Sequence, residues 1–257
     1  MPSAPKPKPS VVTPGNHDGV HLGHRALLSA ARARADRDGL RTVAMYFDPH
    51  PTQVLAPERA PKLLTSIERR ADVLRGAGAD EVLVMPFDAE LSATPPRLFA
   101  ESVLRDACNA RCVVVGPDFH FGKNRAGNVD TLRSLGAELG YDVIVVPPVV
   151  FEGATVSSTR IREALARGAV EDAAAMLTRV HDASGTVVEG HRRGRTIGFP
   201  TANLDCEDVM LPGDGVYAVV GRRIDEPGPL LRGVANLGVR PTLAAGRSVE
   251  VHFFDFD

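Results

Sequence analysis

Short apolar runs alternate with helix-forming segments from about residue 11 to residue 180, and this alternation limits the chain to few folds. The apolar runs lie at residues 11–13, 42–47, 81–85, 112–115 and 142–146. The segments between them place apolar residues at helical spacing, at residues 24–38, 67–76, 95–107 and 129–139. Such an alternation predicts a parallel sheet with helices on both faces. Ligands of these folds bind at the carboxyl ends of the strands, near the point where the strand order reverses.

The character of the sequence changes near residue 182. Two more helices are expected before it, at residues 157–167 and 171–177. Beyond it, short β-prone runs are separated by glycine and proline, with no helical period, which is typical of a small antiparallel β-barrel. The sequence therefore predicts a disordered lead-in, an α/β domain and a β-barrel domain, at residues 1–10, 11–182 and 183–257.

Composition excludes several classes of protein. The net charge of −2 gives no basic field that would favour nucleic acid. No apolar run approaches the roughly 18 residues of a membrane span, and the first ten residues lack the apolar core of a signal peptide. Cys108, Cys112 and Cys206 are sparse and lack the further ligands of a zinc site, which favours a reduced, cytoplasmic protein. A homo-oligomer is compatible with the sequence.

The strongest chemical signal is a pair of histidines at the start of the first predicted helix. His21 and His24 follow a strand and a glycine-rich turn that contains Gly15 and Asp18. Both imidazoles can face one phosphate group, Gly23 lets the backbone come close, and the helix N-terminus adds N–H donors and a partial positive charge. Nucleotidyl transfer needs such a site, because the α-phosphorus is attacked in line while pyrophosphate leaves. The alternative is two unrelated surface histidines beside a turn.

Two further segments can complete a phosphate site. Ser158 and Thr159 begin a predicted helix and offer donors to an anion, and Arg162 can hold the β- or γ-phosphate as a forked donor. Taken alone, this segment is a common helix cap. Asp118 follows a buried strand at the end where ligands collect, and two neighbouring phenylalanines can pack on a flat ring. A structural turn with two core phenylalanines is equally compatible.

The C-terminal region has its own candidates. Thr201 and Asn203 alternate along an extended segment, so both side chains point to one face. Their hydroxyl and amide oxygens suit a Mg²⁺ ion that carries nucleotide phosphates. Glu250, in an alternating strand, can act as the base that accepts a hydroxyl proton. The alternatives are a polar sheet face beside a turn and a solvated strand residue.

These segments, in this order, resemble the bifunctional prokaryotic riboflavin kinase/FAD synthetases. The matching stretches cover nearly the whole chain after the lead-in: residues 15–24 (GNHDGVHLGH), 47–51 (FDPHP), 115–122 (VGPDFHFG), 156–162 (VSSTRIR), 193–203 (RGRTIGFPTAN), 215–218 (GVYA) and 234–242 (VANLGVRPT). The resemblance implies that the C-terminal domain phosphorylates riboflavin to FMN with Mg-ATP. It also implies that the N-terminal domain adenylylates FMN to FAD and releases pyrophosphate.

The same resemblance implies roles for individual residues. The N-terminal site would contact ATP through His21, His24, Ser158, Thr159 and Arg162, with Asp118 lining it. The kinase site would bind Mg-ATP through Thr201 and Asn203, with Glu250 as the base.

The chain departs from the family pattern at four places. His17 stands where the family has phenylalanine, an apolar prop beneath the phosphate turn, and His120 stands where it has arginine. Residues 177–181 differ from the family's segment before the kinase domain. The chain stops at Asp257, whereas the family continues through a strand and a helix that close the barrel, so we expect a truncated barrel with an open edge.

These departures leave two alternatives open. A diverged nucleotidyltransferase would use another phosphorylated small molecule as acceptor, which His17 and His120 would reflect. The C-terminal segment would then be a binding module or a structural remnant.

Overall fold

The structure is a computed structural model, and it describes residues 7–189, 199–206, 209–226, 228–239 and 247–254. The chain divides into two compact units. The first comprises Met1–Lys62, Ile67–Ser158 and Met176–Thr178, and the second comprises Leu63–Ser66, Thr159–Ala175 and Arg179–Asp257.

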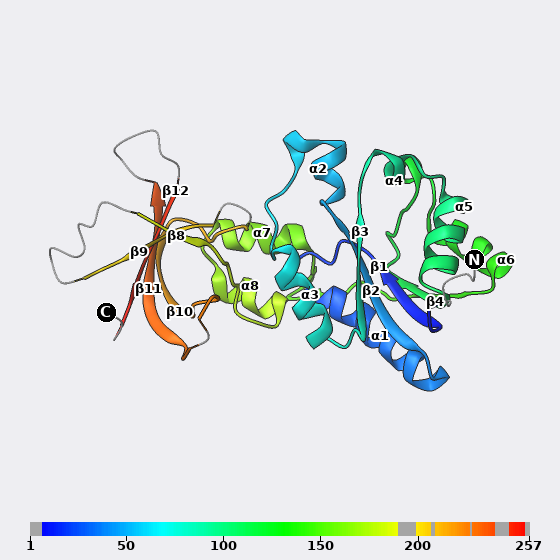
Figure 1. The fold of residues 1–257 in the computed structure, drawn as a ribbon, viewed down its shortest axis with the longest axis horizontal. Coiled ribbons are helices and arrows are strands. Elements are labelled where there is room, and N and C mark those ends of the chain that lie inside the picture. Colours follow the sequence, from blue (N-terminus) through cyan, green and yellow to red (C-terminus); the bar gives the residue numbers. More distant parts are fainter. Residues whose placement is uncertain (1–6, 190–198, 207–208, 227, 240–246, 255–257) are drawn as a thin grey trace. The chain divides into compact units, whose positions relative to one another are not determined.

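The elements of the described residues follow one another as the sequence predicts, with some additions (Figure 1). The α-helices are α1 (Leu22–Asp38), α2 (Pro51–Leu55), α3 (Ile67–Gly76), α4 (Ala89–Ala93), α5 (Pro96–Phe99), α6 (Val129–Leu139), α7 (Ser158–Ala166) and α8 (Val170–Leu177). Two 3₁₀ segments are η1 (Pro57–Arg59) and η3 (Lys123–Arg125), and η2 (Ala100–Ala107) is a π-helix. The strands are β1 (Ser10–Pro14), β2 (Arg41–Asp48), β3 (Glu81–Pro86), β4 (Ala110–Val115), β5 (Asp142–Val145), β6 (Val150–Phe151), β7 (Ala154–Thr155), β8 (Thr186–Val188), β9 (Ala202–Asp205), β10 (Gly215–Gly221), β11 (Leu231–Val239) and β12 (Arg247–Phe253).

The first unit contains the predicted parallel sheet, with strand order β3-β2-β1-β4-β5. The chain moves outward from β1 to β2 and β3, and then returns to β4 on the other side of β1. The strand order therefore reverses between β1 and β4, which is where a ligand of such a fold binds. Strand β1 begins at Ser10, whose side chain is fully buried, so Ser10 belongs to the sheet and not to the expected lead-in.

Helices cover both faces of this sheet, as predicted. On one face, α1 contributes Ala31 and Ala35 to a cluster with Val11 of β1 and Cys112 of β4, and α3 packs beside α1 on β2. On the other face, η2 and α6 pack on β1, β2 and β4. All five residues of β1 are buried, which explains why this strand reads as an apolar run and not as an alternation.

The second unit contains the predicted antiparallel sheet, with strand order β10-β11-β12-β9-β8. One of its faces buries an apolar cluster, formed by Ala235, Leu237, Val249 and Val251. Helices α7 and α8 precede this sheet in the chain, and Leu165 of α7 accepts a hydrogen bond from the backbone N–H of Gly213 at 2.7 Å. None of the helices in the described ranges is both long and apolar enough to cross a membrane.

The structure differs from the predicted elements in a few places. The helix expected at residues 95–107 is divided into α5 and the π-helical η2. Helices α2 and α4 and strands β6, β7 and β11 were not predicted, whereas β9 contains Asn203 of the segment that was expected to be extended. Strand β11 contains glycine and asparagine, which disfavour strands, and it is held in place because it pairs with β10 on one side and with β12 on the other.

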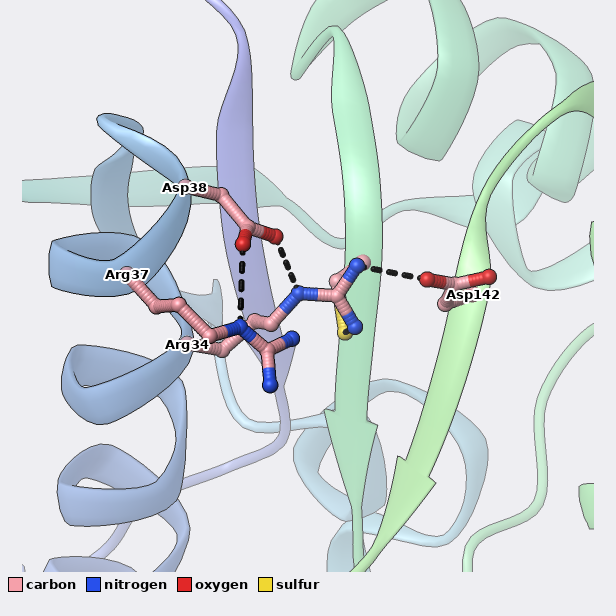
Figure 2. Close-up of polar contacts among 5 residues, drawn as sticks. Arg34, Arg37, Asp38 and Asp142 are labelled. Carbon is pink, nitrogen blue, oxygen red and sulfur yellow. Dashed lines mark hydrogen bonds and ion pairs between the residues drawn. The ribbon is translucent and has the colours of Figure 1, made fainter.

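An ion-pair network joins the end of α1 to the sheet. Arg34 lies between two carboxylates, pairing with Asp38 on its own helix and with Asp142 of β5, the latter at 2.6 Å (Figure 2). Arg37 also pairs with Asp38, at 3.0 Å. Hydrogen bonds from Arg34 and Arg37 lower the pKa of Asp38. The Asp142 side chain is 65% exposed, so solvent screens its pair and the sheet depends more on its apolar core.

The contrast between the exposed ion pair and the buried core predicts unequal effects of two substitutions on stability. Leu104→Ala removes a fully buried side chain between η2 and the sheet and should lower the free energy of unfolding by about 2–5 kcal/mol. Asp142→Asn breaks the exposed ion pair and should lower the free energy of unfolding by a several-fold smaller amount. Urea unfolding of the two variants beside the unchanged protein tests this, and equal losses would contradict it.

Candidate active site

The turn between β1 and α1 lies where the strand order reverses, and its backbone is unusual. His17, Gly19 and Val20 all have positive φ angles, of 48°, 85° and 45°. Two of these residues carry a Cβ atom, and Val20 is also β-branched, so the surrounding structure has to hold this conformation. Backbone hydrogen bonds do so: the N–H of Val20 donates to His17 at 3.0 Å, and the N–H of Gly15 donates to Met45 of β2 at 3.0 Å.

His21 caps the N-terminus of α1. Its Nδ1 accepts a hydrogen bond from the backbone N–H of Gly23 at 3.2 Å. Because Nδ1 accepts, the neutral ring carries its proton on Nε2, which is then a donor. A Cβ atom on Gly23 would lie 3.1 Å from the His21 ring, so glycine lets the ring fold over the helix start. No acidic residue occupies the first turn of α1, which leaves this end of the helix electropositive.

Three imidazole rings gather at this helix start. The rings of His21 and His24 stack, with centroids 3.7 Å apart, and His17 meets His24 edge-on at 5.1 Å. Burial, followed by the neighbouring His21, His17 and Arg70, lowers the pKa of His24 well below its ordinary value. The structure thus brings together the histidine pair that the sequence singled out, with His24 held neutral by its burial.

His17 is a core residue. Its side chain is fully buried, and its Nε2 lies 2.9 Å from the backbone oxygen of Thr13, to which it donates. Burial lowers the pKa of His17 to about 4. The ring therefore props the turn from below, as the family's phenylalanine was expected to do, and this placement removes one observation behind the diverged-acceptor alternative.

Arg70 is a buried residue of this site that the sequence analysis missed. Its side chain has no exposed surface, and its Nη2 donates to Asp18 Oδ1 at 3.2 Å. The sequence did indicate that Arg70 is buried, because Arg70 stands three residues after Ile67 and four before Leu74, on the apolar side of α3.

Ser158, which the first unit includes, contacts the same turn. The hydroxyl of Ser158 donates to the backbone oxygen of Asp18 at 2.9 Å, across 140 residues of sequence. Thr159 and Arg162 follow on α7, and both belong to the second compact unit. Thr159 is exposed and Arg162 is half-buried. Their contact with a nucleotide stays a prediction.

The turn after β4 carries Asp118 at the carboxyl end of the strand, where it is exposed. Its two phenylalanines are mainly structural. Phe121 is 6% exposed and stacks on Phe119 at 5.5 Å within the core of the first unit. His120 is exposed, and its Nδ1 donates to the backbone oxygen of Asp118 at 2.9 Å.

The segment after β2 adds a residue that lies in a matched stretch of the sequence but was not among the predicted site residues. His50 caps α2 and is 8% exposed, and its Nε2 lies 3.0 Å from the side-chain amide of Asn16 in the β1–α1 turn. The carboxyl ends of β1 and β2 are thereby linked through side chains.

The candidates of the second unit lie on its antiparallel sheet. Asn203 of β9 is paired with Glu250 of β12, and Glu250 is paired with Asn236 of β11. Directly opposed residues share a face, so these three form a row on the face opposite the apolar cluster. Thr201 precedes β9 and is exposed. The predicted motif residues 193–198 and 240–242 lie outside the described residues.

Comparison with known proteins decides the family. The FAD synthetase family matches residues 3–160, and the riboflavin kinase family matches residues 177–257. The chain belongs to the bifunctional riboflavin kinase/FMN adenylyltransferases. A relative of that name from Pseudomonas fluorescens is 38% identical over 254 residues, which are 98% of this chain and 80% of the relative. One from Escherichia coli (strain K12) is 38% identical over 95% of this chain and 78% of its own length.

A solved structure supports the same fold. The crystal structure of a protein titled macrolide-efflux protein, from Streptococcus pneumoniae, is 33% identical to this chain with a TM-score of 0.87. The match covers 99% of this chain and 83% of the Streptococcus pneumoniae chain. The predicted resemblance to the bifunctional family is thus confirmed.

The lowered pKa of His17 predicts how stability depends on pH. Since the folded-state pKa of about 4 lies below the ordinary 6.5, the unfolded chain takes up the proton first, and stability is lost as the pH falls from 6.5 toward 4. Between about pH 7.5 and about pH 5.5, His17 alone should lower the free energy of unfolding by about 1 kcal/mol.

His17→Phe removes this group and keeps a ring beneath the turn. Urea unfolding at both pH values should therefore show a smaller loss for His17→Phe than for the unchanged protein. Identical losses in the two proteins would mean that His17 is not held neutral by the fold.

Proposed function

We propose that the first unit transfers the adenylyl group of ATP to FMN, giving FAD and pyrophosphate, and that the second unit phosphorylates riboflavin. The observation that carries the first part is the stacked pair His21 and His24 at the N-terminus of α1, in a chain of this family. The partners are then small molecules, namely ATP, FMN and riboflavin. A cytoplasmic location, where ATP is abundant, fits this chemistry.

In the adenylyl transfer, one bond to the α-phosphorus forms and another breaks. A phosphate oxygen of FMN attacks in line, and the bond to the β-phosphate oxygen breaks as pyrophosphate leaves. Negative charge on the α-phosphate oxygens is stabilised by the Nε2–H of His21, by His24 and by the N–H groups at the start of α1. No covalent intermediate with the protein is needed.

The remaining residues of the first site bind the nucleotide. Ser158 holds the turn through Asp18, and Thr159 offers a hydroxyl to the phosphates. Arg162 would hold the β- or γ-phosphate as a forked donor and so stabilise the leaving group. Gly15 and Gly23 let the backbone approach the phosphates, and Asp118 lines the site from the end of β4.

In the second unit, the side chains of Thr201 and Asn203 offer oxygen atoms, which are the ligands that Mg²⁺ prefers. When bound there with ATP, the ion would neutralise phosphate charge. Glu250 accepts the proton of the riboflavin hydroxyl as that oxygen attacks the γ-phosphorus, while the bond from the γ-phosphorus to the β-phosphate oxygen breaks and ADP leaves. Its place opposite Asn203 on the neighbouring strand supports this role.

His24→Ala tests the adenylyl transfer. Loss of its contact with the transition state should raise the barrier by about 2–4 kcal/mol, which lowers kcat for FAD formation roughly 30- to 1,000-fold. The rate is measured as FAD formed from FMN and Mg-ATP. Full turnover in this variant would remove His24 from the mechanism.

Glu250→Gln tests the kinase reaction. Without the base, FMN formation from riboflavin should fall roughly 100- to 10,000-fold, because the amide cannot accept the proton. FAD formation from supplied FMN should continue, so the two variants act as controls for each other. A variant that loses neither reaction, or both together, would contradict the assignment of Glu250 to a separate kinase site.

A further inference from the structure

Arg70 places a positive charge beneath the β1–α1 turn. Besides its ion pair with Asp18, its Nη1 donates to the backbone oxygen of Asn16 at 3.1 Å. Its Cζ atom lies 5.0 Å from the ring centroid of Tyr46 on β2. One guanidinium therefore connects α3 to two residues of the turn and packs against Tyr46 of the parallel sheet.

This arrangement needs a reason, because a fully buried charge is unfavourable unless it is paired and hydrogen-bonded. The Asp18 carboxylate supplies the opposite charge and is itself only 3% exposed. A guanidinium presents several N–H donors in a fixed fork, whereas an ammonium group is a single point charge. Only the fork can donate to Asn16 and Asp18 from separate nitrogens in one fixed orientation.

The charge also faces the histidines. Besides burial, the neighbouring His21, His17 and Arg70 all lower the pKa of His24. The pKa of His17 is raised by its hydrogen bond to the Thr13 backbone and lowered by Arg70. Arg70 lowers the pKa of both rings, after the larger effect of burial. Its positive charge thus disfavours imidazolium next to the turn.

We propose that Arg70 is a positioning residue of the adenylyl-transfer site: it clamps Asn16 and Asp18 and thereby fixes the backbone from which His21 and His24 meet the phosphates. It acts through the turn and touches no substrate. This inference rests on the proposed function of the first unit, and it adds a residue from α3 to the machinery that the histidine motif provides.

The test compares Arg70→Met and Arg70→Lys in the full chain, with Arg75→Met as the matched control. Arg75 is an exposed arginine of the same helix, with its side chain 57% exposed and paired to Asp72. Arg70→Met should lower kcat for FAD formation by roughly 100-fold, with a smaller change in KM for ATP. Arg75→Met should behave like the unchanged protein, and all variants should keep riboflavin phosphorylation.

The pH profile separates positioning from mere support of the fold. In Arg70→Met the acid limb of kcat should move to higher pH, because the charge that disfavours a protonated His24 is gone. Arg70→Lys keeps the charge and loses the fork, so its acid limb should stay while kcat recovers only in part. An unshifted limb and unchanged kcat in Arg70→Met would overturn the proposal.

Two further outcomes are also decisive. If Arg70→Met does not fold, Arg70→Lys decides: normal kcat in a folded Lys variant overturns the clamp, and a selective loss of FAD formation supports it. If the unchanged protein makes no FAD, the proposed function fails by itself. NMR titration of the histidines then still tests the clamp, since Arg70→Met should raise the pKa of His24 and an unmoved titration would refute it.

Discussion

The turn between β1 and α1 must hold a left-handed backbone at His17 and Val20, and the rest of the site depends on that constraint. Each such residue costs about 1–3 kcal/mol, which the surrounding structure has to offset. It does so from the core, because the Val20 side chain is fully buried against α1, β2 and α3. The geometry offered to a phosphate is therefore set by packing below the turn, and not by the loop itself.

Neutral rings suit the chemistry of this site. A buried imidazolium would need a buried counter-charge, whereas the neutral rings of His17 and His24 leave the anion to the helix N-terminus and to N–H donors. The carboxylate within the turn, Asp18, is already paired with Arg70. The negative charge of Asp18 is thus compensated within the turn.

Periodicity and turn chemistry were enough to predict both sheets and most helices, since buried parallel strands read as apolar runs. They could not predict short helices such as α2, which has no apolar period and is fixed by its His50 cap. The histidine pair was found because its spacing is local. Arg70 was not, because its role depends on a contact 52 residues away in the chain, and in isolation it reads as one charge among several on α3.

The bond between Ser158 and Asp18 has a consequence for how the protein is made. Strand β1 leaves the ribosome before the other strands of its sheet, yet it lies in the middle of that sheet, and its neighbour β4 emerges about a hundred residues later. At typical rates of synthesis, the 140 residues between Asp18 and Ser158 take roughly 7 to 28 s to translate. During that interval the turn exists without one of its partners, so the nascent chain has to protect a central strand before the bond from Ser158 can form.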